Sequence, residues 1–292
     1  MNLLNWKQHR RYKGNLHLHT TNSDGRLSPA EAAAWYRRHG YDFVAFTDHN
    51  KLTTGNGLAD GLLAITGSEL AVDNTELGQT YHLVVLGLPS SITYAEPRLM
   101  PVQAAIDDLN RRGALVILAH PYWSGLTVAD MLPLQGILGI EIYNTSANRD
   151  LGKALATVHW DDVLVRGKRW WGVAVDDSHW IDDDAGGGWV MVEADVLAED
   201  AILAALQAGR FYASTGPDIN SLDFDGTTLM VTCSPVSVIN VIGHTQYGEQ
   251  WRAEPGKALT EASYRVQGKE KYLRVECIDA QGRTAWSNPI YL

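Results

Sequence analysis

The sequence predicts an α/β fold, with a barrel of parallel strands and helices in the first two-thirds and a small β-sandwich at the end. Short apolar runs of strand length alternate with amphipathic helical runs up to Ala208. After Gly216 and Pro217 the chain changes to short alternating strands separated by turn dipeptides. Metal-binding residue types follow the apolar runs, where the active site of a parallel barrel lies. An open wound sheet is the alternative for the first part.

Local signals predict the individual elements. A helix begins after Ser28, because Ser28 and Glu31 form a capping box around Pro29, and it ends at Gly40. Further helices are predicted at residues 101–112 and 199–208. Strands are predicted at residues 15–19, 42–46, 62–65, 81–88, 114–119, 137–143, 170–175 and 190–192, and then at 229–232, 237–242, 263–266, 272–278 and 289–292. We place the domain boundary near residue 218, with the barrel at 1–218 and an immunoglobulin-like β-sandwich at 219–292.

Bulk composition limits the partners and the location. The 292 residues are 45% hydrophobic and 20% charged, which is ordinary for a globular protein. The net charge of −10 disfavours a nucleic-acid polymer as partner, because its phosphates need a positive surface. Residues 1–13 are polar and no apolar run reaches the length of a membrane span, so we expect a cytoplasmic protein with no membrane contact. Cys233 and Cys277 are expected to be buried, reduced thiols, with a disulfide as the alternative.

The most informative motif is His17-Leu18-His19. Residues two apart in a strand point to the same face, so both imidazoles can direct a nitrogen at one divalent ion. The spacing alone also fits ordinary core histidines. Similar residue types recur at other strand ends, however, and such side chains are rarely buried without partners. We therefore predict a metal centre that also includes Asp24, His49, Glu69, His120, Asp177 and His179.

His82 lies at the start of its predicted strand rather than at its end. If residues 69–82 form a hairpin, the strand of His82 runs antiparallel to that of Glu69, and His82 returns to the same end as Glu69. We predict His82 as a further ligand on that condition.

Other polar residues receive less direct roles. Asp48 and Asp176 each precede a predicted ligand, and we expect them to orient neighbouring ligands. Glu141 lies inside its strand, and its role stays open. The histidines away from strand ends are expected to be capping or solvent-exposed; they are His9, His39 and His159.

These segments resemble the PHP family, the polymerase and histidinol phosphatase metal-dependent hydrolases. The matching stretches, in order, are HLHTTNSDG at 17–25, TDHN at 47–50, GSE at 67–69, YH at 81–82, AHP at 119–121 and DSH at 177–179. Within that family, WVMVE at 189–193 and GRFYASTGP at 209–217 are similar to the subgroup that contains carbaryl (carbamate) hydrolases.

The resemblance implies a distorted (β/α)7 barrel that holds two to three divalent ions, with zinc, manganese and iron as candidates. It implies a first site made by His17, His19, Glu69 and Asp177. It implies a second site in which Glu69 bridges to His82 and His120, and a third site made by Asp24, His49 and His179.

Two ions about 3.5–4 Å apart can share a hydroxide that attacks a phosphorus or carbonyl centre. We therefore predict a hydrolase of ester bonds, foremost a phosphoesterase acting on a small anionic substrate such as a nucleotide or a phosphorylated metabolite. A carbamate or ester hydrolase with the same ions is the alternative, and a non-catalytic metal-binding module is a third hypothesis. Asp24 or His179 is the candidate to protonate the leaving group.

Substrate contacts are predicted from the neighbours of these motifs. Arg210 is a candidate to bind an anionic group through its forked guanidinium, with ordinary surface pairing as the alternative. The glycine-rich residues 182–188 predict a mobile loop at the mouth of the site. The aromatic residues beside predicted ligands are candidates to stack on a flat substrate, or else to pack at the barrel rim; they are Trp123, Trp180 and Tyr143.

Overall fold

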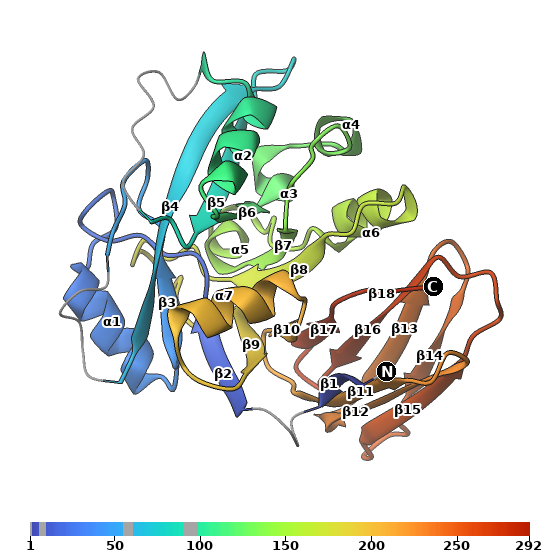
Figure 1. Cartoon of the computed structure of the whole chain (residues 1–292). Coiled ribbons are helices and arrows are strands. Elements are labelled where there is room, and N and C mark those ends of the chain that lie inside the picture. The colour runs from blue at the N-terminus through green and yellow to red at the C-terminus, as the bar shows by residue number, and fades with distance from the viewer. Residues whose placement is uncertain (1, 6–9, 55–60, 90–98) are drawn as a thin grey trace.

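The computed structural model describes residues 2–5, 10–54, 61–89 and 99–292 (Figure 1). His9 therefore lies outside the described residues. The helices are α1 (Pro29–Arg38), α2 (Val102–Arg111), α3 (Pro121–Ser124), α4 (Val128–Met131), α5 (Thr145–Leu151), α6 (Thr157–Val165) and α7 (Glu199–Gln207).

The strands outnumber the helices in the part of the chain that is described. They are β1 (Asn2–Asn5), β2 (Arg10–Asn15), β3 (Phe43–Phe46), β4 (Leu63–Asn74), β5 (Thr80–Leu86), β6 (Leu115–Leu118), β7 (Gly139–Asn144), β8 (Trp171–Val175), β9 (Trp189–Ala194), β10 (Phe211–Ser214), β11 (Ile219–Phe224), β12 (Thr228–Val236), β13 (Val238–Gly243), β14 (Gly248–Arg252), β15 (Leu259–Arg265), β16 (Tyr272–Ile278), β17 (Thr284–Ser287) and β18 (Ile290–Tyr291).

Helix α1 begins and ends where its local signals predict. The Glu31 N–H donates to the Ser28 hydroxyl over 3.3 Å, and the Glu31 carboxylate accepts from the Ser28 N–H over 2.9 Å. This reciprocal capping box satisfies backbone donors that the first turn leaves free. Gly40 follows the helix with a φ of 78°, a left-handed conformation that ends helices.

One large sheet contains the consecutive strands β2 to β8 in chain order. The pairs β2–β3, β3–β4, β6–β7 and β7–β8 are parallel, as predicted. Strand β5 departs from the expected parallel sheet, because it runs antiparallel to both β4 and β6. The physical reason is the tight turn between Thr75 and Gln79, which joins β4 directly to β5 without a crossover helix. The fold is therefore a mixed α/β fold with few helices.

Strand β2 lies earlier in the sequence than the strand predicted at residues 15–19. Strand β2 ends at Asn15, so His17 and His19 lie just beyond it. Their backbone still pairs with the segment after β8, because the Asp177 N–H donates to the His17 carbonyl and the His19 N–H donates to the Ser178 carbonyl. The two histidines thus keep strand-like pairing although they lie outside the strand.

Alternate residues of these strands build the interior. Phe43 and Ala45 of β3, Ile65 of β4 and Val84 of β5 belong to one buried cluster, because side chains two apart in a strand share a face. The opposite faces pack against helices. Helix α1 covers β3, α2 covers β4 and β6, α6 covers β7, and α7 covers β9 and β4 (Figure 1).

The large sheet continues into the last part of the chain. Strand β10 pairs with β9 on one side and with β17 on the other, and β16, β13 and β14 follow. A second sheet has the order β1-β11-β12-β15. Both sheets contribute to one buried cluster, in which Cys233 and Cys277 lie as free thiols. Two strand pairings, β1 with β11 and β10 with β17, cross residue 218, and the division at 218 stays a prediction.

A buried ion pair connects the two parts of the chain. Arg274 of β16, 2% exposed, donates from both Nε and a terminal nitrogen to the carboxylate of Asp161 on α6, over 2.8 and 2.6 Å. Its other terminal nitrogen donates to Glu276 over 2.6 Å. None of the described helices is long and apolar enough to cross a membrane.

Candidate metal centre

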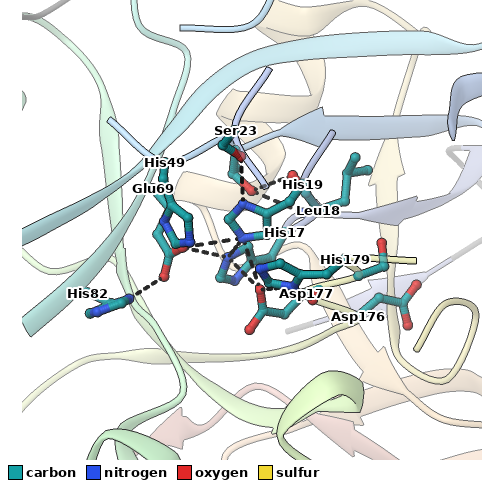
Figure 2. A network of polar contacts seen from close by, with 12 residues as sticks. His17, Leu18, His19, Ser23, His49, Glu69, His82, Asp176, Asp177 and His179 are labelled. Atoms are coloured by element: carbon teal, nitrogen blue, oxygen red, sulfur yellow. Dashed lines mark hydrogen bonds and ion pairs between the residues drawn. The ribbon is translucent and has the colours of Figure 1, made fainter. Parts of the chain in front are cut away.

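On strands β4 and β5, the same face contributes apolar side chains to the core at one end and candidate ligands at the other end. Ile65 and Glu69 are four residues apart on β4, and Val84 and His82 are two apart on β5, so each pair shares a face. Ile65 and Val84 lie in the core. Glu69 and His82 lie at its edge, where they meet the segments that follow β2, β3 and β8 (Figure 2).

Four buried side chains form the first group. His17 Nε2 lies 3.1 Å from both His19 Nε2 and Asp177 Oδ1, and His19 Nε2 lies 3.1 Å from the same oxygen. Glu69 Oε2 lies 3.4 Å from His17 Nε2 and 3.3 Å from His19 Nε2. All four side chains are buried.

This arrangement fits a bound ion. Four donors placed tetrahedrally at 2.0–2.1 Å from one cation are about 3.3 Å from each other, and the distances from the two histidine nitrogens to each other and to the carboxylate oxygens, 3.1–3.4 Å, match that spacing. In the described part of the chain, Glu69 and Asp177 have ion-pair partners that are all histidines. Imidazole nitrogens with carboxylate oxygens suit zinc, manganese or iron.

Glu69 joins the first group to a second. Its other oxygen, Oε1, lies 2.7 Å from His82 Nδ1 and 3.1 Å from His120 Nε2. The antiparallel β4–β5 hairpin that brings His82 to this position confirms the condition on which His82 was predicted. One carboxylate therefore faces two groups of histidines, as a bridging ligand would.

A third group lies at the more exposed side. Asp24 Oδ2 lies 3.4 Å from His49 Nε2 and 3.6 Å from His179 Nε2, and Asp24 Oδ1 lies 3.6 Å from His19 Nδ1. These four residues can offer ligand atoms within 4.8 Å of one another. His19 was predicted for the first group alone, but its second nitrogen faces this one. The structure thus brings all nine predicted ligand residues together.

The electrostatics of the first group favour positive charge. Burial by itself would lower the pKa of His19, but hydrogen bonds to Asp177 and Glu69 raise it to about 9. Burial likewise opposes the raised pKa of His17, which Asp177, Glu141 and Glu69 bring well above its ordinary value. Burial would raise the pKa of both Glu69 and Asp177, yet the facing histidines hold both lowered. A divalent cation would supply the charge that protons otherwise supply.

Sparsely populated backbone conformations occur at the site. His120 has a φ of 24° and Asp177 a φ of 56°, and such strain concentrates at functional positions. Gly25 is required for a different reason, since a Cβ there would lie 2.5 Å from the carbonyl oxygen of His19. The tight turn after Asp24 therefore needs glycine.

Glu141 has a structural role toward His17. Its Oε1 accepts from His17 Nδ1 over 2.6 Å, which leaves Nε2 of that ring free to face the cluster. Its Oε2 accepts from the His120 N–H over 2.8 Å and from Asn144 Nδ2 over 2.9 Å. Asn144 also donates to Asp177 Oδ2 over 3.1 Å. The role left open by the sequence is thus to orient ligands.

Asp48 reaches the candidate ligands indirectly, through the residues between them. It accepts hydrogen bonds from Thr20, Ser23 and Thr53, and so fixes the loop between His19 and Asp24. The Ser23 hydroxyl also lies 3.4 Å from His19 Nδ1 and 3.1 Å from Asp24 Oδ1, so Asp48 supports these candidate ligands through that hydroxyl as well as through the loop.

Asp176 differs from the prediction, because its carboxylate turns away from the cluster (Figure 2). It accepts from the N–H groups of Gly186, Gly187 and Gly188 over 2.8, 2.8 and 3.0 Å. Asp184 similarly accepts from the N–H of His179 over 2.7 Å. Residues 184–188, predicted to be mobile, are therefore tied down. Glycine is needed at 188 because a Cβ would lie 2.8 Å from the Val175 carbonyl oxygen.

A cavity of about 260 Å³ opens over the second and third groups. His17 and His19 lie beneath the surface, whereas the side chains of His49, His82 and His179 are 20–30% exposed. The cavity is lined by Asp24, His49, Glu69, His82, His120, Trp123, Ser146, Ala147, Asp150, Asp177 and His179.

The structure does not bring Arg210 to this cavity. Arg210 precedes β10, whose first residue Phe211 pairs with Val192 on β9, while Val190 of β9 pairs with Gly14 near the end of β2. Arg210 is thus at the opposite end of these strands from the cluster. The prediction failed because strand direction in the sheet, not sequence proximity, decides which end a residue reaches.

Two of the three predicted stacking residues pack elsewhere. Trp180 donates its indole N–H to the His19 carbonyl over 2.9 Å and packs edge-on against Tyr36. Tyr143 stacks with Trp286 at 6.2 Å between ring centroids. Trp123 alone of the three lines the cavity. The predicted bystander His39 stacks on Trp35 at 3.7 Å, away from the cluster.

Sequence reasoning missed the residues of α5. Ser146 and Asp150 line the cavity, and Arg149 lines an adjoining hollow of about 350 Å³ that shares Ser146, Asp150 and His179 with it. The signal was available, because α5 directly follows β7 at the strand end that carries the ligands. Arg149 makes no ion pair with any described carboxylate.

No family model and no curated protein matches this sequence. Among solved structures, the chain is similar to a two-domain protein containing a predicted PHP-like metal-dependent phosphoesterase from Bacteroides vulgatus. The two are 15% identical, with a TM-score of 0.52 over 97% of this chain and 95% of that chain. An amidohydrolase from Chromobacterium violaceum, solved with sulfate and no metal, is 18% identical with a TM-score of 0.46 over 68% of this chain and 96% of that one. The chain therefore shares the fold of that two-domain protein over nearly its whole length.

Proposed function

We propose that this protein is a metal-dependent phosphoesterase that hydrolyses a small phosphate ester. The observation that carries the proposal is the arrangement of the three groups of histidines and carboxylates. Glu69 belongs to both the first and the second group, and His19 to both the first and the third. The second and third groups open to one cavity. A closed structural site needs four ligands around one ion. Nine side chains around an accessible cavity suit two or three ions that meet a substrate.

The ligand assignment belongs to the same proposal. Glu69 would bridge a first ion, held also by His17, His19 and Asp177, and a second ion, held by His82 and His120. Asp24, His49 and His179 would hold a third, with zinc, manganese or iron as the metal. We also propose that strands β2 to β8 form the distorted seven-stranded barrel and that the two C-terminal sheets form an immunoglobulin-like sandwich. The parallel bridge from Leu18 to Ser178 supports closure of that barrel.

When bound, such ions lower the pKa of water toward neutrality and neutralise charge on phosphate oxygens. The chain's own residues orient these groups. His179 donates from Nδ1 to the Asp177 carbonyl over 2.9 Å, so its Nε2 lone pair faces Asp24. This orientation suits a ligand better than a proton donor. A carboxylate that holds an ion has no proton to give, so Asp24, half exposed at the cavity, is the proposed donor to the leaving group only where the third ion is not bound.

A carbamate or carboxylic ester hydrolase is the second candidate, and the similarity to carbaryl hydrolases stays a prediction. Trp123 favours this candidate, because it gives the cavity an apolar wall. Arg149 at the adjoining hollow favours a phosphate ester. A guanidinium forms strong charge-assisted hydrogen bonds with phosphate oxygens, and a neutral ester offers no charge for such bonds.

The deciding experiment loads the metal-free protein with Zn²⁺, Mn²⁺ or Fe²⁺ and measures the ions per chain. Hydrolysis of p-nitrophenyl phosphate and of a p-nitrophenyl carbamate is then followed with the same chromophore, with Glu69→Ala as the inactive control. Phosphate hydrolysis supports the proposal, and carbamate hydrolysis alone would replace it with the second candidate. Fewer than two ions per chain with neither activity would leave a non-catalytic metal-binding module.

A further inference from the structure

The indole ring of Trp123 is held in a fixed orientation at the wall of the cavity. Its centroid lies 5.1 Å from that of His120 with the rings at 78°, and 6.5 Å from that of His82 at 67°. Both histidines are candidate ligands of the second group. Trp123 is therefore roughly perpendicular to both rings, and it lines the cavity with 38% of its surface exposed.

Asp150 fixes the ring from the other side. The Trp123 indole N–H donates to Asp150 Oδ2 over 2.9 Å, from α3 to α5. This bond satisfies the single polar atom of the side chain, so the surface that the ring presents to the cavity is purely apolar. Packing against His120 and hydrogen bonding to Asp150 together restrict rotation of the ring.

The charges of the other lining residues indicate which substrate groups can bind beside Trp123. Among the described residues, the charged side chains that line the cavity besides the histidines are the carboxylates of Asp24, Glu69, Asp150 and Asp177, with no lysine or arginine. Ions bound to the cluster would offset Glu69, Asp177 and Asp24. Asp150, which lies on Trp123, would not be offset and would repel an anionic group there.

We infer that Trp123 forms a leaving-group subsite, in which a planar, uncharged aromatic ring of the substrate stacks on the indole while Asp150 acts as its positioning residue. The inference rests on the proposed function, because the metal groups would hold the phosphate. The substrate class is then an aryl or arylmethyl phosphate monoester. The cavity volume of about 260 Å³ lies below the usual range for drug-sized ligands and fits a substrate with one small ring.

The test uses two non-hydrolysable probes that differ only in planarity, benzylphosphonate and cyclohexylmethylphosphonate. Their binding to the metal-loaded full chain is measured by calorimetry, so the result does not depend on turnover. The wild type is expected to bind benzylphosphonate about tenfold more tightly, since aromatic stacking contributes up to about a factor of ten beyond burial of area. Trp123→Leu should remove this preference, and Trp123→Phe should keep part of it.

Asp150 is tested by its conservative replacement. Asp150→Asn keeps an oxygen that can accept the indole N–H and should retain the preference, whereas Asp150→Ala should weaken benzylphosphonate binding several-fold and leave cyclohexylmethylphosphonate unchanged. Trp251→Leu, on β14 away from the cavity, is the matched control. The thermal midpoint of each variant shows whether it folds.

Equal binding of the two phosphonates by the wild type, or a preference that survives Trp123→Leu, would overturn the inference. Tighter binding of 2-carboxyethylphosphonate than of benzylphosphonate would also overturn it, in favour of an anionic leaving group at Arg149. These outcomes differ from failure of the proposed function, in which the wild type hydrolyses no phosphate ester whichever phosphonate it prefers.

Discussion

Glu141 and His17 form a 2.6 Å hydrogen bond in which neither side chain is exposed to solvent. The carboxylate accepts from Nδ1 and so fixes the tautomer in which Nε2 is a free donor to a metal. Partners of this kind raise the basicity of a ligating histidine and hold its ring in position. Glu141 also holds the backbone of His120, so it supports two of the three groups at once.

Replacing Glu141 with Ala should weaken metal binding about 10- to 100-fold, the usual effect of removing such a partner. The measurement is competition with a chromogenic chelator for the loaded ion. Glu270→Gln, a buried glutamate of the C-terminal part, provides the control, and its affinity should equal that of the wild type. An unchanged affinity in Glu141→Ala would show that His17 needs no orientation.

Glu69 and His82 differ in how many groups they serve, and ion counting can detect the difference. Glu69 faces both the first and the second group, whereas His82 belongs only to the second. Glu69→Ala should therefore lose more than one ion per chain, and His82→Ala only one, in plasma emission spectrometry after dialysis. Equal losses in the two variants would contradict a bridging carboxylate.

Arg149 and Arg210 make a matched pair, because both are exposed arginines but only Arg149 adjoins the cavity. Arg149→Ala should lower kcat/KM for p-nitrophenyl phosphate about fivefold, which corresponds to about 1 kcal/mol of charge-assisted hydrogen bonding at an exposed position. Arg210→Ala should leave it unchanged. The neutral substrate p-nitrophenyl acetate should show no loss in either variant, and a loss there would indicate distortion of the site instead.

Arg274 should be a major contributor to the free energy of unfolding. Arg274→Ala leaves the carboxylates of Asp161, 32% exposed, and Glu276, 13% exposed, without their buried partner, so the loss should be at most the roughly 3–5 kcal/mol that a fully buried, unpaired charge costs. Arg166, the C-cap residue of α6, pairs with Asp162, and both side chains are 45% exposed, so Arg166→Ala should cost less than about 0.5 kcal/mol. Urea unfolding of both variants checks the contrast.

The stability of the C-terminal part should depend on pH through Glu270. Burial would raise its pKa, but hydrogen bonds from the Tyr264 hydroxyl and from the N–H groups of Gln267 and Lys269 lower it to about 2. A lowered pKa means that the stabilisation is complete above the ordinary pKa of about 4.5 and is lost as the pH falls toward 2.

Glu270→Gln should therefore be less stable than the wild type at pH 7, with the difference shrinking between pH 4.5 and pH 2.5. Thermal midpoints across that range test the sign. A difference between the two proteins that stays constant with pH would mean that the charge of Glu270 contributes nothing.

Local signals in the sequence predicted what local chemistry decides. The capping box of Ser28 and Glu31 located α1, and the residue types at strand ends located the side chains that could hold metal ions. The position of His82 followed from a hairpin. That hairpin could be proposed because few residues separate Glu69 from His82 in the sequence. The capping box and the hairpin depend on residues that are close in the sequence. The candidate ligands were recognisable because the same residue types recur at the ends of several strands.

Properties that depend on the arrangement of distant strands could not be predicted. Arg210 was assigned to the site because it lies in a family-like segment, but the antiparallel course of β9 and β10 takes it to the other end. Glu141 could not be assigned, because its role depends on where His17 and His120 lie in space. Trp123 was distinguished from Trp180 and Tyr143 only by the cavity.

The pairing of β1 with β11 affects how the protein can be made. Asn5 pairs with Ser221, which lies 221 − 5 = 216 residues later in the chain, so β1 can join its sheet only after β11 has been synthesised. Loop closure over such a separation is slow, and until then β11 has an unpaired edge that invites aggregation. Expression at low temperature, and affinity tags at the C-terminus rather than beside β1, should therefore raise the yield of correctly assembled protein.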